Sequence, residues 1–384
     1  MRIGIDAHGV GGHSLGLGNE TYFRNLIASL LAIDHRNEYH IFINHPEALE
    51  GIVRDHSNVR LVSFFPSSQW IQRPLSIPFY ARRHKLDLVH VAFIRPPFTH
   101  CKTVITVHDV SYEIRPEDYH WLDRWRMKLL VQDSCRRADL IFTVSNHARR
   151  EINERYGIPM EKIVVTYNAA DHAKQSSSST AKVPVPLADL PIPYILFLGL
   201  IQPRKNLVRL IEAFDLFKSR TDLPHHLVIA GKWGWGNTEL KHTLDQLKHR
   251  DHIYLAGYIS SRDIDKVMRD AALFVFPSLY ESFAIPPMEA QQLSVPALVA
   301  NNTCFPEIYG DSVLYCDPFS VDSIAEGIAK GLQDSVIRME LIKRGHQRAR
   351  EFSWAKTARI ALAAYESLFP HSVKAEREGE LANR

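Results

Sequence analysis

The stretch Leu279-Tyr280-Glu281-Ser282-Phe283-Ala284-Ile285-Pro286-Pro287-Met288-Glu289 joins a predicted buried strand at 273–276 to a predicted helix. Prolines fit the first turn of a helix, because the amides there lack intrahelical acceptors. Glu281 is therefore expected beyond the strand's carboxyl end, and Glu289 in the opening turns of the helix. In an open α/β sheet this crevice binds ligands, and loop amides beside a helix start favour anionic or oxygen-rich ones. The alternative is a solvated loop glutamate followed by a helix-stabilising one.

Short β-rich runs alternate with longer amphipathic segments in two series, one over residues 2–168 and one that restarts at Tyr194. This alternation predicts mainly parallel sheets covered by helices on both faces. The expected fold is α/β, with two doubly wound Rossmann-like domains facing a central cleft. The first covers residues 1–175 and the second 194–353, with a serine- and proline-rich linker at 176–193. A helix at 354–369 carries an apolar stripe that needs a partner, and a polar tail follows at 370–384.

The composition suits two globular domains rather than a nucleic-acid binder or a disulfide scaffold. The chain has 384 residues, 45% of them hydrophobic and 23% charged, and a net charge of +3. Its four cysteines are widely separated without a C-x-x-C pair, which argues against a zinc site and fits a reducing compartment. No apolar run is long enough to span a bilayer, and the N-terminus lacks a signal-peptide core. A cytoplasmic protein is expected, with peripheral contact at the inner face of the cell membrane still open.

Two cations, Arg204 and Lys205, follow the first predicted strand of the second domain. Asn206 is expected to cap the helix beyond them. Cations between a strand end and a helix start suit a diphosphate, because Arg offers a fork of donors and Lys a point charge. A solvated basic turn is the alternative, and the acidic loop at Glu281, expected at the same sheet edge, argues against it.

His108 ends a predicted strand at 102–108. A histidine at a strand tip in the cleft could donate to a sugar hydroxyl or to charge developing on a leaving group. A structural or merely exposed histidine is the alternative. The position of His108, rather than its residue type, separates it from the other histidines.

A glycine-rich loop follows the first strand. Its glycines are Gly9, Gly11, Gly12, Gly16 and Gly18. Such a loop lets backbone amides approach a phosphate or a sugar. The G-x-G-x-x-G spacing fails, and the second strand ends without an acidic residue, so nicotinamide binding is rejected.

Two further segments have open interpretations. The loop at 301–307 is expected at the ligand-binding edge, where its polar groups could read a base, hold the neighbouring loop, or only cap a helix. In the first domain, aromatic and basic residues share the runs 64–85 and 121–128, which suits an anionic lipid surface or a lipid-linked acceptor. A helix that is partly solvated and partly buried is the alternative there.

Taken in order, these segments resemble the family-4 retaining glycosyltransferases (GT4), and within them the mannosyltransferase-like branch of bacterial surface-polysaccharide enzymes. The likeness covers nearly the whole chain. It is carried by the opening strand and glycine loop, His108-Asp109, the cluster at 203–206, the stretch 281–289, and the start of the last helix at 352–354.

The resemblance implies a GT-B fold whose last helix crosses back to the first domain. It also implies a hexosyltransferase that needs no cofactor or metal and uses a nucleotide-sugar co-substrate, with GDP-mannose favoured. The acceptor would be a saccharide or a polyprenyl-diphosphate-linked glycan in O-antigen or related lipopolysaccharide biosynthesis. Glu281, His108, Arg204 and Lys205 would then carry catalysis. The donor-binding residues would be Glu289, Ser282, Phe283, Ala284, Ile285, Gly16 and Gly18.

This chain departs from the family pattern at Ser282 and Ala284, where many members have glycines, and at Glu20, where an aromatic or basic residue is frequent. The sequence therefore predicts the reaction class more firmly than it predicts the donor sugar or the acceptor contacts. The alternatives are a UDP-sugar-dependent glucosyl or N-acetylhexosaminyl transferase, a sugar-nucleotide epimerase, and a non-catalytic sugar-nucleotide-binding subunit. The sequence leaves open the acceptor, the linkage position and the oligomeric state.

Overall fold

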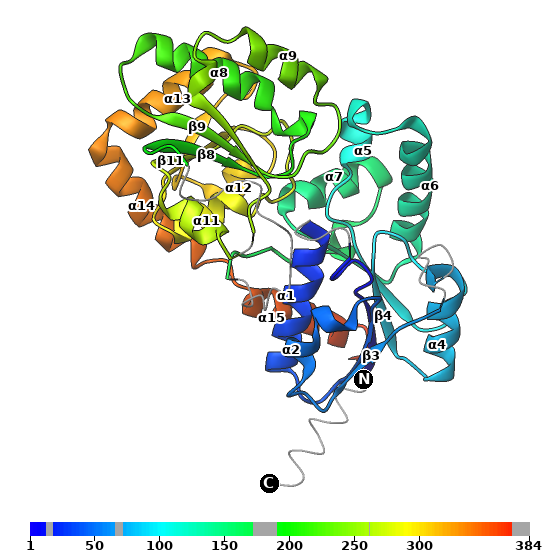
Figure 1. Ribbon diagram of the computed structural model, residues 1–384. Helices are drawn as coiled ribbons and strands as arrows, with labels where there is room; N and C mark the ends of the chain where they lie inside the picture. Colours follow the sequence, from blue (N-terminus) through cyan, green and yellow to red (C-terminus); the bar gives the residue numbers. More distant parts are fainter. Residues whose placement is uncertain (13–17, 66–71, 172–189, 261, 371–384) are drawn as a thin grey trace. The chain divides into compact units, whose positions relative to one another are not determined.

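The computed structural model describes residues 1–12, 18–65, 72–171, 190–260 and 262–370. The chain divides into two units (Figure 1). One unit contains residues up to 173 together with those from 353 onward, and the other contains 174–352. Most of the predicted linker and all but the first residue of the predicted tail lie outside the described residues.

The first unit is built on a seven-stranded parallel sheet with the order β3-β2-β1-β4-β5-β6-β7. Its strands are β1 (Arg2–Asp6), β2 (Glu38–Phe42), β3 (Val59–Val62), β4 (Leu88–Ala92), β5 (Lys102–Thr106), β6 (Leu140–Thr143) and β7 (Ile163–Val165). Its α-helices are α1 (Gly18–Ile33), α2 (Glu50–Val53), α4 (Ile77–Arg83), α5 (Ser111–Ile114), α6 (Trp121–Arg137), α7 (Asn146–Tyr156) and α15 (Trp354–Ser367).

The second unit repeats the scheme with six parallel strands in the order β10-β9-β8-β11-β12-β13. Its strands are β8 (Tyr194–Leu198), β9 (His226–Ala230), β10 (Ile253–Gly257), β11 (Leu273–Phe276), β12 (Ala297–Ala300) and β13 (Leu314–Cys316). Its α-helices are α8 (Leu207–Arg220), α9 (Thr238–Gln246), α10 (Ile264–Arg269), α11 (Pro286–Gln292), α12 (Phe305–Tyr309), α13 (Val321–Gln333) and α14 (Ser335–Ala349). The two sheets confirm the predicted α/β class with two Rossmann-like domains.

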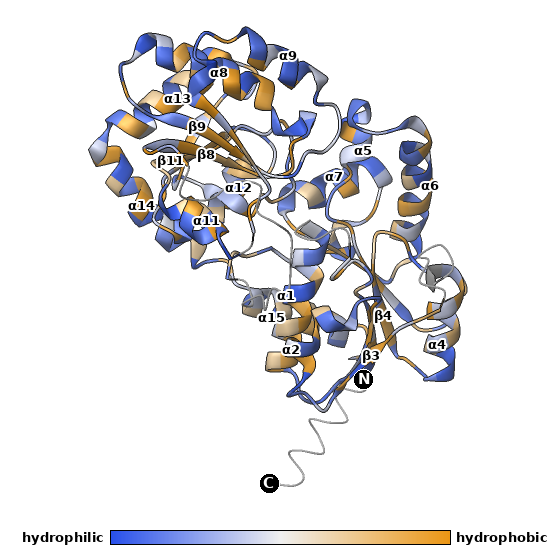
Figure 2. Cartoon of the chain, viewed as in Figure 1, coloured by the Kyte–Doolittle hydropathy of each residue, from blue (hydrophilic) through white to orange (hydrophobic). Residues whose placement is uncertain are grey.

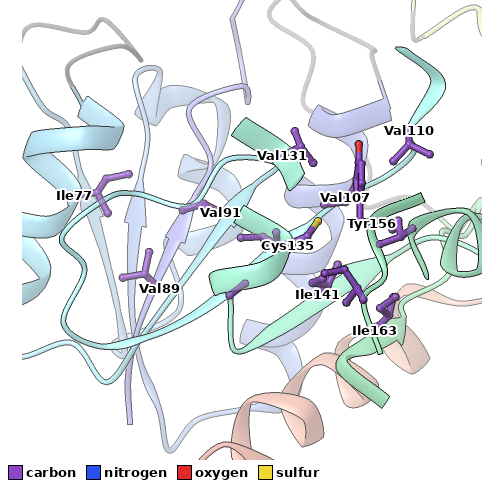
Figure 3. Close-up of a cluster of buried hydrophobic side chains, with 14 of the residues drawn as sticks. Ile77, Val89, Val91, Val107, Val110, Val131, Cys135, Ile141, Tyr156 and Ile163 are labelled. Atoms are coloured by element: carbon purple, nitrogen blue, oxygen red, sulfur yellow. The ribbon is translucent and has the colours of Figure 1, made fainter. Parts of the chain in front are cut away.

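Burial explains why the central strands are almost continuously apolar. Strands covered on both faces have no solvent side, so alternation of polar residues disappears. Figure 2 shows this as mostly orange, hydrophobic strands such as β8 and β9, beside helices in which hydrophilic and hydrophobic residues alternate. One core cluster of the first unit lies between the sheet and its helices, with Ile77 of α4, Val131 and Cys135 of α6, and Ile141 of β6 packed together (Figure 3).

The helix α15 belongs to the first unit, as predicted, although the whole second unit precedes it in the chain. Ser353 caps its start by accepting a hydrogen bond from the Lys356 amide at 3.2 Å. The Tyr365 hydroxyl lies 2.7 Å from Nδ1 of the buried His90, and the Trp354 amide donates to Asp171 at 3.1 Å. These bonds and the contact of α15 with α1 give its apolar stripe a fixed partner.

Predicted element boundaries differ from the observed ones by a few residues, and several short helices were not predicted. The four-residue α5 and the seven-residue α4 are examples. One or two turns contain too few residues to display a 3.6-residue period. None of the helices in the described part of the chain is both long and apolar enough to cross a bilayer.

Candidate functional site

Strands β8 and β11 are neighbours in the second sheet although about 75 residues separate them. The strand order reverses between them, and the crevice beyond such a switch point is the usual ligand site of an open α/β sheet. The loop after β8 carries Arg204 and Lys205 in a short 3₁₀ turn, Pro203–Lys205. The loop after β11 carries Glu281. The topology therefore brings the predicted cations and the predicted carboxylate to one edge of one sheet.

Three side chains form a charged cluster at this edge. Lys205 Nζ donates to Glu281 Oε1 at 2.6 Å, and Arg204 Nη1 lies 3.4 Å from Glu281 Oε2. Arg204 also donates to the carbonyl of Tyr280 at 3.0 Å, which ties the two loops together. The Lys205 side chain is 11% exposed and that of Glu281 9% exposed, whereas Arg204 is more open at 21%. We call Arg204, Lys205 and Glu281 the charged cluster.

The cluster sets the protonation of its members. Burial opposes ionisation of Glu281, but the adjacent Lys205 and Arg204 outweigh it and lower the pKa of the carboxyl. Burial, assisted by Arg204, lowers the pKa of Lys205 while Glu281 resists that change. The Lys205 ammonium also lies 4.7 Å from the centre of the Phe276 ring, a favourable cation–π contact. Glu281 is thus ionised at neutral pH.

Asn206 plays a different part from the predicted helix cap. It stands just before α8 with φ of 62°, and its side chain makes no capping bond. Instead its amide nitrogen donates to the carbonyls of Pro277 at 3.0 Å and Pro318 at 2.6 Å. Its Oδ1, the atom that would accept from a helix amide, accepts from Arg209 Nη1 at 3.0 Å instead, so the prediction was wrong. Asn206 joins the loops that follow β8, β11 and β13.

The stretch 282–285 bends into α11 through a left-handed residue, Ala284, at φ 64°. The hydroxyl of buried Tyr309 donates to the Ala284 carbonyl and holds this bend. Phe283 is buried and packs edge-on against Phe352, with ring centres 5.7 Å apart. Tyr309 is a positioning residue that sequence reasoning missed, because it is nearly thirty positions from the charged cluster.

The remaining predicted donor contacts lie on the same loop and helix. Ser282, Ala284, Ile285 and Glu289 are each half-buried. Glu289 stands in the first turn of α11, as predicted, and its charge contributes to the raised pKa of Tyr309, which burial chiefly causes.

The loop at 301–307 holds its neighbour, one of the three roles left open. Asn302 donates from Nδ2 to the carbonyl of Leu279 at 3.0 Å. The backbone amide of Glu281 donates to Thr303 Oγ1 at 3.4 Å. These bonds orient the backbone that carries Glu281.

In the first unit, His108 follows β5 at the carboxyl edge of the sheet and is buried. Its ring packs edge-on against Tyr22 with centres 4.9 Å apart, and Phe93 lies on another side at 5.9 Å. Burial lowers the pKa of His108 to about 4, so the imidazole is neutral at pH 7. Its Nε2 has no hydrogen-bond partner among the described residues.

The glycine loop places a second histidine at the same edge. His8 Nδ1 bonds Asp6 at the end of β1, and both side chains are almost fully buried. Gly11 has φ of 79°, and a Cβ there would lie 2.6 Å from that of Ala48, so only glycine fits. Glu20 accepts from the Gly11 amide at 3.2 Å and closes the loop. The Asp-x-His pair at the end of β1 was the signal that sequence reasoning overlooked.

Gly18, one of the two glycines predicted to bind the donor, begins α1 and is exposed. Gly16 lies outside the described residues. The charged cluster belongs to the second unit and His108 to the first. A shared cleft between them stays a prediction. Among the described residues, no group of three or more His, Cys, Asp or Glu side chains is placed to hold a metal ion.

Two family models match the chain, one in each half. The model described as Glycosyltransferase Family 4 matches residues 18–174, and that described as Glycosyl transferases group 1 matches residues 182–348. The first match includes His108, and the second includes the charged cluster and the loop at 301–307.

Curated relatives and solved structures point the same way. The chain is 33% identical over 270 residues to the O-antigen chain mannosyltransferase B of Escherichia coli, covering 70% of this chain and 71% of that protein. It is 29% identical over 279 residues to the serotype-specific mannosyltransferase WbdA of Escherichia coli, covering 71% of this chain but 34% of that longer protein. A solved sucrose-phosphate synthase from Thermosynechococcus elongatus shares the fold, with a TM-score of 0.70, 18% identity, and coverage of 96% of this chain and 99% of that one.

Proposed function

Because this chain belongs to the family-4 glycosyltransferases and has their GT-B fold, we propose that it transfers mannose from GDP-mannose with retention of anomeric configuration. The acceptor in this proposal is a saccharide or a polyprenyl-diphosphate-linked glycan of an O-antigen or related polysaccharide. The names of the relatives support the sugar and the acceptor class. A lipid-linked acceptor also implies peripheral contact of the N-terminal unit with a membrane.

The charged cluster is the observation that carries the proposal. A buried lysine and a buried carboxylate 2.6 Å apart at the switch point are organised before any ligand arrives. A diphosphate entering there competes with Glu281 for Lys205 and Arg204. Glu281, still ionised, is then released towards the hydroxyls of the attached sugar. Charge that develops on the departing diphosphate is stabilised by cations already in position.

The proposed chemistry proceeds on one face of the sugar. The bond between the anomeric carbon and the β-phosphate oxygen breaks, and the acceptor oxygen bonds that carbon from the same side. The acceptor proton passes to the departing phosphate oxygen. Neutral His108 serves as a hydrogen-bonding partner of the reacting sugar, and Glu289 holds the ribose. No metal enters this scheme.

The direct test measures release of GDP from GDP-mannose in the presence of acceptor. We expect Glu281→Ala, Lys205→Ala and Arg204→Ala to lose transfer while circular dichroism shows an intact fold. The matched control removes the exposed pair Arg220–Asp322 of the same unit, whose atoms lie 2.6 Å apart, and should leave transfer unchanged. Full activity in both the Glu281 and the Lys205 variants would end the proposal.

The donor and the stereochemistry need separate measurements. GDP-sugars should raise the melting temperature more than UDP- or ADP-sugars, because a ligand selective for the folded state stabilises it. An NMR spectrum of the product should show the anomeric configuration of the donor. A preference for UDP-sugars would contradict the proposed donor, and a product of inverted anomeric configuration would contradict the proposed retention. Donor conversion without acceptor would favour an epimerase.

A further inference from the structure

Two histidines at the carboxyl edge of the first sheet each keep one ring nitrogen unpaired. Nε2 of His8 and Nε2 of His108 are buried and have no hydrogen-bond partner among the described residues. An unpaired buried nitrogen costs free energy, which a ligand that pairs with it would recover. His108 already has a part in the proposed chemistry. His8 is a buried histidine with an open position that this chemistry leaves unused.

Asp6 fixes the orientation of the His8 ring. Nδ1 of His8 bonds the Asp6 carboxylate, and the His8 backbone amide donates to the same oxygen at 3.2 Å. The His8 side chain is 0% exposed and that of Asp6 1%. Because a carboxylate only accepts hydrogen bonds, Nδ1 carries the proton, and the neutral ring then presents a lone pair at Nε2. The open position of His8 is thus a hydrogen-bond acceptor.

His90, on the neighbouring strand β4, is a structural histidine at the same sheet. Both of its ring nitrogens are paired, Nδ1 with the Tyr365 hydroxyl at 2.7 Å and Nε2 with Thr106 Oγ1 at 2.6 Å. Burial chiefly lowers the pKa of His90 to about 3, while Asp6 opposes the shift and His108 adds to it. Asp6 and His108 therefore both lie close enough to act on it electrostatically. Its full pairing shows that an open nitrogen is not general among the buried histidines here.

The pair of Asp6 and His8 lies at the switch point of the first sheet. The strand order reverses between β1, which ends at Asp6, and β4, so this crevice corresponds to the one that holds the charged cluster in the second sheet. A lone pair backed by a carboxylate opposes phosphate oxygens, which are negatively charged and also only accept. A hydroxyl can donate to it. The chemistry of His8 therefore selects a neutral, hydroxyl-bearing ligand such as a saccharide.

We propose that His8 accepts, through Nε2, a hydrogen bond from a hydroxyl of the acceptor saccharide, with Asp6 as the positioning residue that fixes its tautomer. The inference rests on the proposed function, in which the donor is held by the second unit and the attacking hydroxyl gives its proton to phosphate. The hydroxyl bound by His8 is therefore a different one, and His8 is a specificity residue. Half-buried Phe64 stacks on the His8 ring with centres 6.4 Å apart, so we expect binding to move Phe64.

The test measures binding of methyl α-mannoside to the full chain by ligand-observed NMR, which needs no transfer. In His8→Asn the side-chain nitrogen takes the place of Nδ1 and keeps a donor for Asp6, but Nε2 is lost. We expect this variant to bind the glycoside roughly tenfold more weakly. In GDP release its KM for the glycoside should rise by a similar factor. Its kcat and the increase in melting temperature caused by GDP-mannose should change little.

A matched control is His45→Asn. His45 also bonds a carboxylate two residues away, Glu47 at 3.2 Å, but its side chain is 47% exposed, and its replacement should leave glycoside binding unchanged. Thermal unfolding checks that each variant is folded. A ¹⁵N NMR spectrum of the histidine-labelled wild type gives a second measurement. The His8 signal, identified by its loss from His8→Asn or His8→Gln, should show an unprotonated Nε2 that shifts when methyl α-mannoside is added.

Four outcomes would overturn the inference. They are equal glycoside binding by wild type and His8→Asn, no glycoside binding by wild type, a protonated or unresponsive Nε2 of His8, and a higher KM for GDP-mannose with an unchanged KM for the glycoside. A wild type that does not respond to GDP-mannose would instead count against the proposed function. The glycoside measurement decides the role of His8 in either case.

Discussion

The charged cluster of the second unit has ionised groups almost removed from water. Taking a charge out of water costs several kcal/mol, which a close partner offsets. The attraction between Lys205 and Glu281 offsets the cost of burying both charges. Arg204, which is more exposed, adds a second attraction to Glu281. Sequence reasoning placed each of the three at a strand end. The direct ion pair could not be predicted, because it depends on β8 and β11 being neighbours and on side-chain rotamers.

Removing one member of the pair should destabilise the unit more than removing both. Lys205→Met leaves buried Glu281 with only the more exposed Arg204, and Glu281→Gln leaves buried Lys205 beside a like charge. Each change should cost up to about 3–5 kcal/mol. The double variant should cost clearly less than the sum, as measured by denaturant unfolding. The exposed pair Arg220–Asp322 is the matched control, where each change should cost about 1 kcal/mol or less. Strictly additive costs at Lys205 and Glu281 would contradict the coupling.

His108 predicts a dependence of stability on pH. Burial lowers its pKa in the folded chain to about 4, whereas an unfolded histidine titrates near 6.5. Between these values the unfolded state binds more protons, so stability falls as the pH drops through that window, by up to about 3 kcal/mol. Above pH 6.5 the contribution is fully present. Between pH 7 and 4 the free energy of unfolding of His108→Asn should fall less than that of the wild type. Parallel plots of unfolding free energy against pH for the two proteins would refute this.

At the scale of elements, the carboxyl ends of β8 and β9 meet at two glycines. Gly231 has φ of 149°, and a Cβ there would lie 1.7 Å from the Gly199 carbonyl oxygen. This contact allows the loop after β9 to leave the sheet beside the loop that carries Lys205. Gly199 and Gly231 end strands that the sequence pattern predicts at 194–199 and 227–231. The close approach between them is tertiary, and neither propensity nor periodicity could reveal it.

Gly231→Ala should therefore destabilise the second unit by more than about 3 kcal/mol, because backbone has to move. Gly157→Ala is the matched control. Gly157 also has a positive φ, 65°, but nothing lies within 4 Å of its added Cβ, so only the left-handed cost of about 1–2 kcal/mol applies. Thermal unfolding of both variants decides the matter. Similar losses would mean that the contact between the glycines is easily relieved.

Long helices and buried strands were predicted more accurately than short elements. The sequence pattern predicts a helix over residues 146–156, and α7 has these bounds. In the structure Ser145 caps it and Gly157 ends it in a left-handed conformation. The strand ends needed for the site were also placed correctly. Asn206 was misassigned because its sequence position fits a cap equally well, and only the neighbouring carbonyls of Pro277 and Pro318 show its actual bonds.

At the scale of the molecule, the first unit is assembled from segments on both sides of the second. Truncation before Ser353 should expose the face of α1 that α15 covers and remove Tyr365, one of the two hydrogen-bond partners of His90. We expect the first unit to lose its cooperative unfolding transition while the second retains one, observable by calorimetry. Truncation after Pro370 is the control and should leave both transitions in place. An unchanged first transition in the shorter chain would show that α15 is dispensable.

The return of α15 also has a consequence for biosynthesis. The ribosome makes β1 to β7 first, yet the segment that completes their packing emerges only after residues 174–352. At 5–20 residues per second, that delay is on the order of ten seconds or more. During this interval the nascent N-terminal half presents an uncovered apolar surface while the following half can already fold. We expect a chaperone that acts during translation to bind this intermediate at the uncovered face of α1.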